Sequence, residues 1–221
     1  MLIAGFPAGA LQANCYLVAT GPGAGCVVID PGQDSADRVR QTCAEHQLTP
    51  VAVLLTHGHF DHVGGAAEVS GDYGIDVYFG AGDRGLLADP LSAVSAEFKS
   101  FLAGQEFPGE PGRVVDIDRP TVLTLADVPV EVIPTPGHTP GSTCYGLAAA
   151  DGRPAVLFTG DTLFAGSIGR SDLPGGDGAL LAESIRRELL SRPDDTVVLP
   201  GHGPSTSVGA EQRTNPFLQD T

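Results

Sequence analysis

Val51-Ala-Val-Leu-Leu-Thr-His-Gly-His-Phe-Asp-His62 joins an apolar run directly to a cluster of histidines and one aspartate. The apolar residues 51–55 predict a strand that is buried on both faces. In an extended chain His57 and His59 are two residues apart, so both side chains point to the same side. Asp61 and His62 fall where the next helix is expected to begin. Asp61 alone could be the N-cap of that helix, but its place in the cluster favours a metal ligand.

Three further segments place a histidine or an aspartate after an apolar strand in the same way. They are residues 130–137 before His138, residues 155–160 before Asp161, and residues 196–201 before His202. In open α/β sheets, ligand sites gather at the carboxyl ends of the strands. We therefore expect all four segments to deliver their polar side chains to one edge of the fold. His46 has no such setting and is expected to be a structural histidine.

These segments together supply a set of imidazoles and carboxylates that is typical of metal binding. The candidate ligands are His57, His59, Asp61, His62, His138, Asp161 and His202. The set is too large for one ion but suits a pair of ions, provided that one carboxylate bridges them. Imidazole and carboxylate ligands suit Zn²⁺, Fe²⁺ and Mn²⁺. We expect two divalent metal ions, with zinc as the first choice and iron or manganese as alternatives.

The remaining apolar runs predict an α/β protein in which helices cover the sheets. Strands are expected at 14–19, 26–29, 51–55, 75–79, 121–125, 128–133, 143–147, 155–159 and 196–199, and helices at 33–47, 63–70, about 93–103 and 177–191. The strands come in two batches, each followed by helices, which favours an α/β sandwich. Residues 82–112 are otherwise ambiguous, and we expect them to shape the substrate entrance.

The composition excludes some classes of protein. A chain of 221 residues with 42 % hydrophobic and 18 % charged residues can form a packed core without disulfides. The net charge of −15 and the single lysine, Lys99, argue against nucleic acid as a partner. No apolar run is long enough for a membrane span and no signal peptide is visible, so we expect a cytoplasmic protein without a membrane partner. The oligomeric state cannot be inferred from the sequence.

The four cysteines are Cys15, Cys26, Cys43 and Cys144, and none belongs to a Cys-x-x-Cys pair. This pattern is typical of a reduced protein with small buried thiols. Cys144 lies six residues after His138, which leaves a metal role open for it.

Thr56-His-Gly-His-Phe-Asp-His62 resembles the signature of the metallo-β-lactamase superfamily. The later strand-end histidines and aspartate match the remaining motifs of that family in order, and Ile29-Asp-Pro-Gly32 resembles its early aspartate-containing strand end. The resemblance covers nearly the whole chain. It implies a four-layer αβ/βα sandwich in which residues 1–221 form a single domain.

The resemblance also assigns the candidate ligands to two metals. It implies a first metal held by His57, His59 and His138, and a second metal held by Asp61, His62 and His202, with Asp161 as the bridge.

Within the superfamily, the chain looks most like glyoxalase II-type thioester hydrolases, and in particular like a short subgroup of hydroxyacylglutathione hydrolase-like proteins. The segments that carry this resemblance are Thr135-Pro-Gly-His-Thr-Pro-Gly-Ser142, Gly160-Asp-Thr-Leu-Phe164, and Gly166-Ser-Ile-Gly-Arg170 followed by Ser171-Asp-Leu-Pro-Gly-Gly-Asp177. Glyoxalase II has a separate C-terminal helical domain that holds glutathione with basic residues, whereas here only Arg213 is basic after His202. Asp172 and Pro204 stand where glyoxalase II has tyrosines. The thiol of the substrate therefore stays open.

The resemblance implies a metal-dependent hydrolase of small thioesters such as S-lactoylglutathione. A hydroxide between two metals would attack the carbonyl, and one metal would stabilise the oxyanion. A thiolate leaves with a pKa of about 8.5 and needs little acid catalysis. We expect Asp61 to orient the hydroxide, Asp161 to bridge the metals, and Arg170 to bind an acidic part of the substrate, with a structural salt bridge as the alternative for Arg170.

Three other functions remain open at this point. Persulfide dioxygenases, which use a single iron, resemble the chain near Gly169-Arg-Ser-Asp172. A lactone or β-lactam hydrolase would keep the fold and change the substrate. A metal-stabilised binding protein without turnover would keep the ligands and lack the chemistry.

Overall fold

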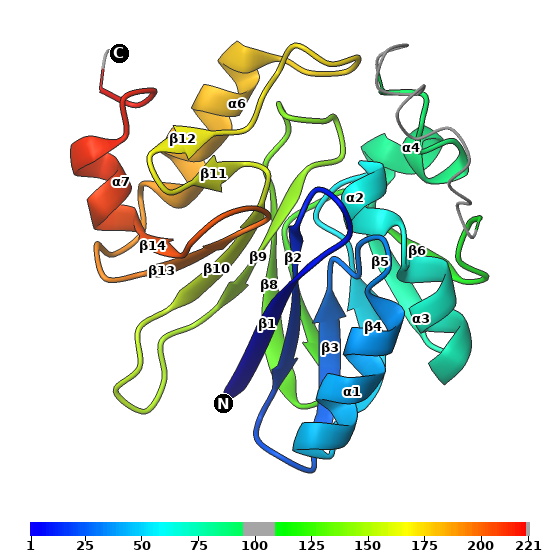
Figure 1. The fold of residues 1–221 in the computed structure, drawn as a ribbon. Helices are drawn as coiled ribbons and strands as arrows, with labels where there is room; N and C mark the ends of the chain where they lie inside the picture. The colour runs from blue at the N-terminus through cyan, green and yellow to red at the C-terminus, as the bar shows by residue number, and fades with distance from the viewer. Residues whose placement is uncertain (95–108, 220–221) are drawn as a thin grey trace.

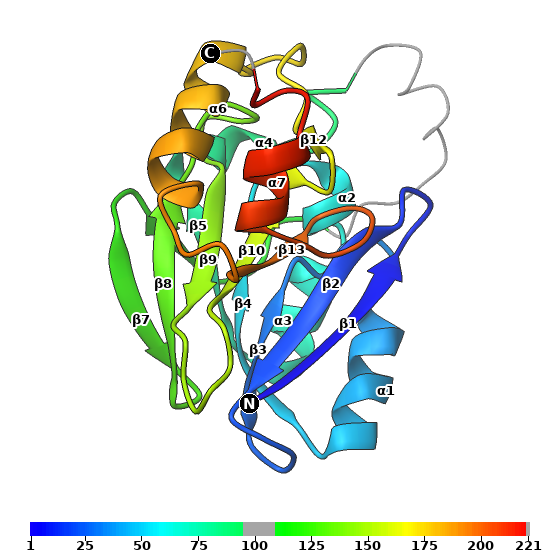
Figure 2. The same cartoon turned by 90° about the vertical axis from the view of Figure 1, so that its left-hand side faces the viewer.

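In a computed structural model of the chain, residues 1–94 and 109–219 are described. Two six-stranded sheets lie face to face, and helices cover the outer face of each sheet (Figures 1 and 2). This arrangement confirms the predicted four-layer αβ/βα sandwich. That the chain forms one domain, without a separate C-terminal helical domain, stays a prediction.

The first sheet takes nearly all its strands from the first half of the chain. Across the sheet they are β1 (Leu2–Ala8), β2 (Ala13–Ala19), β3 (Gly25–Ile29), β4 (Thr49–Leu54), β5 (Asp76–Gly80) and β6 (Val114–Ile117). The first three strands pair antiparallel, and β3 to β6 pair parallel. The helices of this half are α1 (Ala36–His46), α2 (Phe60–Val63), α3 (Ala66–Tyr73), a 3₁₀ turn η1 (Ala81–Asp83) and α4 (Arg84–Ala88).

The second sheet is built from the rest of the chain. In the order β14-β13-β10-β9-β8-β7 its strands are β14 (Thr206–Ser207), β13 (Val197–Pro200), β10 (Val156–Gly160), β9 (Thr143–Leu147), β8 (Val128–Pro134) and β7 (Thr121–Leu125). Only β10 and β13 pair parallel. A small hairpin of β11 (Leu163–Phe164) and β12 (Ser167–Ile168) and the helical segments α6 (Gly178–Ser184), η2 (Ile185–Leu189, a π-helical turn) and α7 (Val208–Thr214) complete this half.

Three apolar layers separate the four layers of backbone. Alternate residues of one strand enter different layers, since successive side chains of a strand point to opposite faces. In β2, Cys15 and Leu17 pack under α1 and α3, whereas Tyr16 and Val18 pack between the two sheets. The third layer lies under α6, η2 and α7 and contains Leu181 and its neighbours on the helices. The side-chain period of the strands therefore produces the sandwich.

Tyr145 of β9 links the two sheets through a buried hydrogen bond. Its side chain is fully buried, and its hydroxyl donates to the carbonyl of Leu55 at 2.8 Å. We expect Tyr145→Phe to lower the free energy of unfolding by about 1–2 kcal/mol, because the buried carbonyl loses its donor while the ring still packs. Urea unfolding with an unchanged m value would measure this loss, and a variant as stable as the parent would contradict it.

Several elements differ from the sequence-based expectation. The helix predicted at 63–70 is split into α2 and α3 at Gly64-Gly65, where a side chain on Gly65 would lie only 2.6 Å from the carbonyl oxygen of Gly32. Val51 is 38 % exposed, so residues 51–55 are not buried on both faces throughout. The helix predicted at 177–191 ends in a π-helical turn. The structure adds β1, β6, β14 and α7 to the prediction. The helix expected at about 93–103 falls mainly outside the described residues.

The structure bears on two further expectations from composition. All four cysteines are free and buried, as predicted. Within residues 1–94 and 109–219, the helices are too short or too polar to cross a lipid bilayer.

Candidate metal centre

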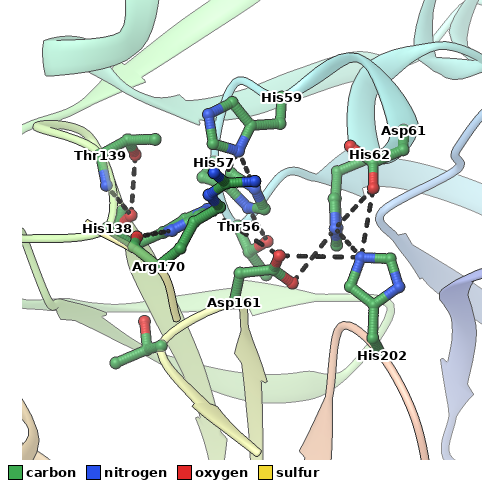
Figure 3. Close-up of polar contacts among 12 residues, drawn as sticks. Thr56, His57, His59, Asp61, His62, His138, Thr139, Asp161, Arg170 and His202 are labelled. Carbon is green, nitrogen blue, oxygen red and sulfur yellow. Dashed lines mark hydrogen bonds and ion pairs between the residues drawn. The ribbon is translucent and has the colours of Figure 1, made fainter. Parts of the chain in front are cut away.

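The structure brings the seven predicted ligands together where strands of both sheets end (Figure 3). His57, His59, Asp61 and His62 follow β4, whereas His138 follows β8, Asp161 follows β10 and His202 follows β13. The convergence at the carboxyl ends of the strands is therefore as expected. His46 lies in the last turn of α1, and the ligand groups found among the described residues do not include it; its structural role stays a prediction.

His57, His59 and His138 form a tri-histidine group. Nδ1 of His59 lies 3.1 Å from Nε2 of His57 and 3.0 Å from Nε2 of His138. All three side chains are buried. Three imidazole nitrogens that converge at this spacing form a site in which each can offer a lone pair to one ion.

Two of the three imidazoles, those of His57 and His138, have a partner on the nitrogen that points away from the cluster, and this partner fixes the ring tautomer. Nδ1 of His138 lies 2.7 Å from the carbonyl oxygen of Arg170, which can only accept, so Nδ1 carries the proton and Nε2 faces the cluster with its lone pair. Nδ1 of His57 lies 3.1 Å from the hydroxyl of Thr56, and this hydroxyl itself donates to Asp30 at 2.6 Å. Thr56 therefore accepts from His57, whose Nε2 also presents its lone pair. The donor set thus suits a metal ion.

Asp61, His62 and His202 form a second group beside the first. Nε2 of His202 lies 3.1 Å from Oδ2 of Asp61 and 3.3 Å from Nε2 of His62. Nδ1 of His62 donates to the buried Asp30 at 2.9 Å, so Nε2 of His62 is also oriented toward the cluster. One carboxylate and two imidazoles are a ligand set that a divalent cation accepts.

Asp161 lies between the two groups. Its Oδ1 is 3.3 Å from Nε2 of His62, and its Oδ2 is 3.7 Å from Nε2 of His202 and 3.8 Å from Nε2 of His138. The carboxylate therefore faces both groups at once (Figure 3). In the described part of the chain, neither Oδ1 of Asp161 nor Nε2 of His59 has a hydrogen-bond partner although both atoms are buried. An orphaned buried carboxylate oxygen fits a site that a cation completes.

The electrostatics of the cluster keep His57 and His59 neutral and the carboxylates ionised, whereas the carboxylates raise the pKa values of His62 and His202. Burial lowers the pKa of His57 and lowers that of His59 to about 4, so both rings are neutral at pH 7. Burial alone would raise the pKa of Asp61 and Asp161, but the imidazoles of His62 and His202 together outweigh it and keep both pKa values low. Burial opposes protonation of His62 as well, yet the carboxylates of Asp161, Asp61 and Asp30 raise its pKa. Neutral imidazoles and ionised carboxylates are the forms that bind metal.

The loop that carries His202 is tied to the first sheet. The carbonyl oxygen of Pro200 accepts hydrogen bonds from the hydroxyl of Tyr16 at 2.8 Å and from the side-chain amide of Asn14 at 3.0 Å. The same amide donates to the carbonyl of Gly203 at 3.0 Å. Residues of β2 thus hold a ligand loop that belongs to the other sheet.

The cluster forms the floor of a cavity of about 390 Å³. The apolar part of its wall comes from Leu11, Phe60, Ala93, Val94 and Leu173. Ala93 and Val94 belong to the segment 82–112 that was expected to shape the entrance. Arg170 also lines the cavity, but its guanidinium donates to both oxygens of Asp172, at 2.7 and 2.8 Å. The hydrogen bonds to Asp172 raise the pKa of Arg170 and lower that of Asp172 to about 2.

Some features of the site were not predicted from the sequence, and one interpretation was wrong. The N-cap of α2 is His59, and Asp61 lies within the first turn of the helix, so Asp61 is not the cap. Cys144 is buried against the hydroxyl of Thr135, and no ligand group found in residues 1–94 and 109–219 includes a cysteine. The sequence analysis linked Asp30 only to the family resemblance and did not single out Asp83. Both aspartates follow apolar strands, as the ligands do, and both contact residues of the site.

A four-layer sandwich with clustered histidines and aspartates at its strand ends defines a class of metal-dependent hydrolases. The chain belongs to the metallo-β-lactamase superfamily, whose family model matches residues 8–202. The family and the His/Asp groups together imply divalent metal ions.

Proteins of similar sequence span nearly the whole chain. An uncharacterised protein of Mycobacterium leprae is 50 % identical over 99 % of each chain. YqgX of Bacillus subtilis, named a probable metallo-hydrolase, is 40 % identical over 96 % of this chain and 95 % of its own. The hydroxyacylglutathione hydrolase GloC of Haemophilus influenzae is 36 % identical, again over 96 % of this chain and 95 % of its own.

Three solved structures with differing names have the same fold. The BLEG-1 B3 metallo-β-lactamase has 37 % identity and a TM-score of 0.84, over 99 % of this chain and 100 % of that chain. TTHA1623 in a di-iron-bound form has 38 % identity and a TM-score of 0.80, over 97 % and 100 %. ETHE1 from Myxococcus xanthus has 26 % identity and a TM-score of 0.78, over 100 % and 86 %.

Proposed function

We propose that this protein hydrolyses small thioesters with the help of two divalent metal ions. The observation that carries the proposal is the placement of two ligand groups on either side of Asp161, at the floor of a cavity. The relative named as a hydroxyacylglutathione hydrolase supports a thioester as the substrate class. We also propose that the protein acts in the cytoplasm, on a small molecule and not on nucleic acid or at a membrane.

The structure gives three overlapping ligand groups, and the one that joins Asp161 to His57 and His62 links the two proposed sites. His57, His59 and His138 would hold the first ion, and Asp61, His62 and His202 the second, with Asp161 as the bridge. We propose zinc because its tetrahedral preference matches three protein ligands and an open position. The di-iron form of TTHA1623 supports iron as an alternative, and manganese accepts the same ligands.

The side chains of the site divide the work of hydrolysis. When bound, a pair of divalent cations supplies a hydroxide at neutral pH and a Lewis acid for the carbonyl oxygen. The negative charge of Asp161 would offset part of the positive charge of both ions, and we propose that the carboxylate of Asp61 orients the attacking water. Because Nδ1 of His138 is fixed by the carbonyl of Arg170, the ring cannot turn away from the cluster. A thiolate leaves without a strong general acid, so the site needs no further proton donor for a thioester.

The wall of the cavity supports a substrate with an apolar part near the reacting carbonyl. Leu11, Phe60 and Leu173 offer apolar contacts, and Arg170 is the cation that the structure places in this wall. Arg170 is 60 % exposed and paired with Asp172, as the salt-bridge alternative foresaw. We propose that a substrate carboxylate competes with Asp172 for this guanidinium.

Replacement of Arg170 tests that role. We expect Arg170→Ala to raise KM about tenfold for S-lactoylglutathione, which carries carboxylates, because a charge-assisted hydrogen bond is lost. A neutral thioester of mercaptoethanol should keep its KM. Arg187→Ala serves as the control, since Arg187 is an exposed arginine of η2 that pairs with Glu183. An equal change for both substrates would contradict the proposed contact.

The test of the function is an assay of thioester hydrolysis on protein of known metal content. Purified protein loaded with zinc, iron or manganese should release thiol from S-lactoylglutathione or from a simpler hydroxyacyl thioester. Chelation should abolish the release, and added metal should restore it. Fully loaded protein that hydrolyses none of a broad set of thioesters would overturn the proposal.

Hydrolysis of β-lactams is a second candidate, which the similarity to the BLEG-1 B3 metallo-β-lactamase favours. The same metal-loaded samples should therefore be offered a chromogenic β-lactam and a lactone. Oxygen consumption with a persulfide and a single bound iron would instead identify a dioxygenase. Bound metal without turnover of any of these substrates would identify a binding protein.

A further inference from the structure

A buried aspartate outside the ligand set connects the two loops of the tri-histidine group. Asp83 ends the 3₁₀ turn after β5, and only 1 % of its surface is exposed. Its Oδ2 accepts from the backbone N–H of Gly58 at 2.8 Å and from the hydroxyl of Thr139 at 2.6 Å. Its Oδ1 accepts from the backbone N–H of Gly141 at 2.6 Å. All three donors are neutral groups.

Two of these three donors lie directly beside histidine ligands. Gly58 stands between His57 and His59, and Thr139 directly follows His138. One carboxylate therefore holds the loop of the first two histidines and the loop of the third against each other. In the described part of the chain, Asp83 accepts no hydrogen bond from the ligands of the second group.

The two loops that contact Asp83 pack too closely for its carboxylate to take another position. A Cβ atom on Gly141 would lie 2.7 Å from Cγ of Asp83, and one on Gly58 would lie 2.6 Å from Cβ of Leu86. Both distances are shorter than real contacts allow, so these positions require glycine. The backbone closes on the carboxylate from both sides.

We propose that Asp83 is a positioning residue that sets the spacing of His57 and His59 relative to His138, and thereby the affinity of the first metal site and not of the second. A buried carboxylate with three neutral donors is costly to desolvate and is not needed to fill space. Its hydrogen bonds are charge-assisted and short, so they fix the two loops more rigidly than an amide would. This inference rests on the metal sites of the proposed function, but it does not depend on the substrate.

The chain offers a matched control in Glu211. This residue is also buried, at 3 % exposure, and accepts from three neutral donors: the backbone N–H of Gly166, the hydroxyl of Thr206 and the side-chain amide of Asn215. It ties α7 to β14 and to the hairpin of β11 and β12, and none of these three donors is a ligand or the direct neighbour of one. Glu211→Gln therefore reports what the loss of a buried charge does to stability alone.

The test measures metal affinity in proteins that keep one site each. His202→Ala weakens the second group and leaves the first, whereas His57→Ala does the reverse. We expect Asp83→Asn to lower zinc affinity about 10–100-fold in the His202→Ala background, as loss of groups that orient metal ligands does. In the His57→Ala background the affinity should change less than about threefold. Competition with a chromophoric chelator gives these values without any assay of turnover.

Two further variants keep the proposal falsifiable if Asp83→Asn does not fold. Thr139→Val removes one donor with little change in shape and should lower the affinity of the first site alone, whereas Thr139→Ser should retain it. Glu211→Gln should lower Tm and leave both affinities unchanged. Equal affinity loss at both sites, or none at the first, would overturn the role of Asp83. Failure to hydrolyse thioesters with normal metal binding would overturn only the proposed function.

Discussion

Asp161→Asn is expected to lower thioester hydrolysis by about 10³-fold or more and to release at least part of the bound metal. The carboxylate lies within 3.8 Å of a ligand nitrogen from each group, so its negative charge offsets the charge of both proposed ions. Asparagine has the same shape but no charge. The loss of one electrostatic contact to a reacting centre costs about 10²–10³-fold, and here metal binding is weakened as well.

The measurements for this variant are kcat/KM and metal content on the same sample. Asp194→Asn is a suitable control, because Asp194 is an exposed aspartate whose carboxylate pairs with Arg213 on the surface. It should behave as the parent does. If Asp161→Asn kept its metal and stayed within tenfold of the parent in kcat/KM, Asp161 would not be the bridge.

The second large effect is expected from a glycine that the sequence does not distinguish from others. In Gly201→Ala the added Cβ would lie 2.3 Å from Oδ1 of Asp161 and 2.7 Å from Cε1 of His62. Since neither distance is tolerable, the proposed bridge or its neighbour must move by several tenths of an ångström. A displacement of about 1 Å at a reacting centre costs about 10²-fold, so we expect a loss of up to that size, and overpacking costs about 1–3 kcal/mol of stability.

Gly71→Ala is the matched control for Gly201→Ala. Gly71 lies in α3, and a Cβ atom there would meet nothing within 4 Å, so activity should be unchanged. Steady-state kinetics, thermal unfolding and metal content on both variants separate a local clash from general instability. A Gly201→Ala protein with parental kinetics would show that the site has more freedom than these distances allow.

The ligand set could be predicted from the sequence because each ligand directly follows an apolar strand. A strand is recognised locally, and its carboxyl end fixes where the next side chain lies. The apolar runs of β2, β3 and β4 were recognised as strands for the same reason. The four layers then follow from covering both faces of two sheets.

The anchors of the site were not predictable in the same way. Asp30 and Asp83 also follow strands, but nothing local separates a carboxylate that binds metal from one that binds backbone N–H groups. The contacts of Asn14 and Tyr16 with Pro200 join residues more than 180 positions apart, which no local pattern records. The edge strand β1 escaped prediction because Gly5 and Pro7 interrupt its pattern, and such residues are tolerated at an edge.

Each ligand group draws its members from both sheets: His57 and His59 meet His138, and Asp61 and His62 meet His202. Neither half of the chain can therefore form a complete site by itself. Metal ions bind tightly only after the two halves have packed against each other during folding. A captured ion in turn opposes their separation, with a strength set by its affinity and concentration. Bound cations therefore hold the two sheets together. Where metal is scarce, we expect the whole protein to be less stable as well as inactive.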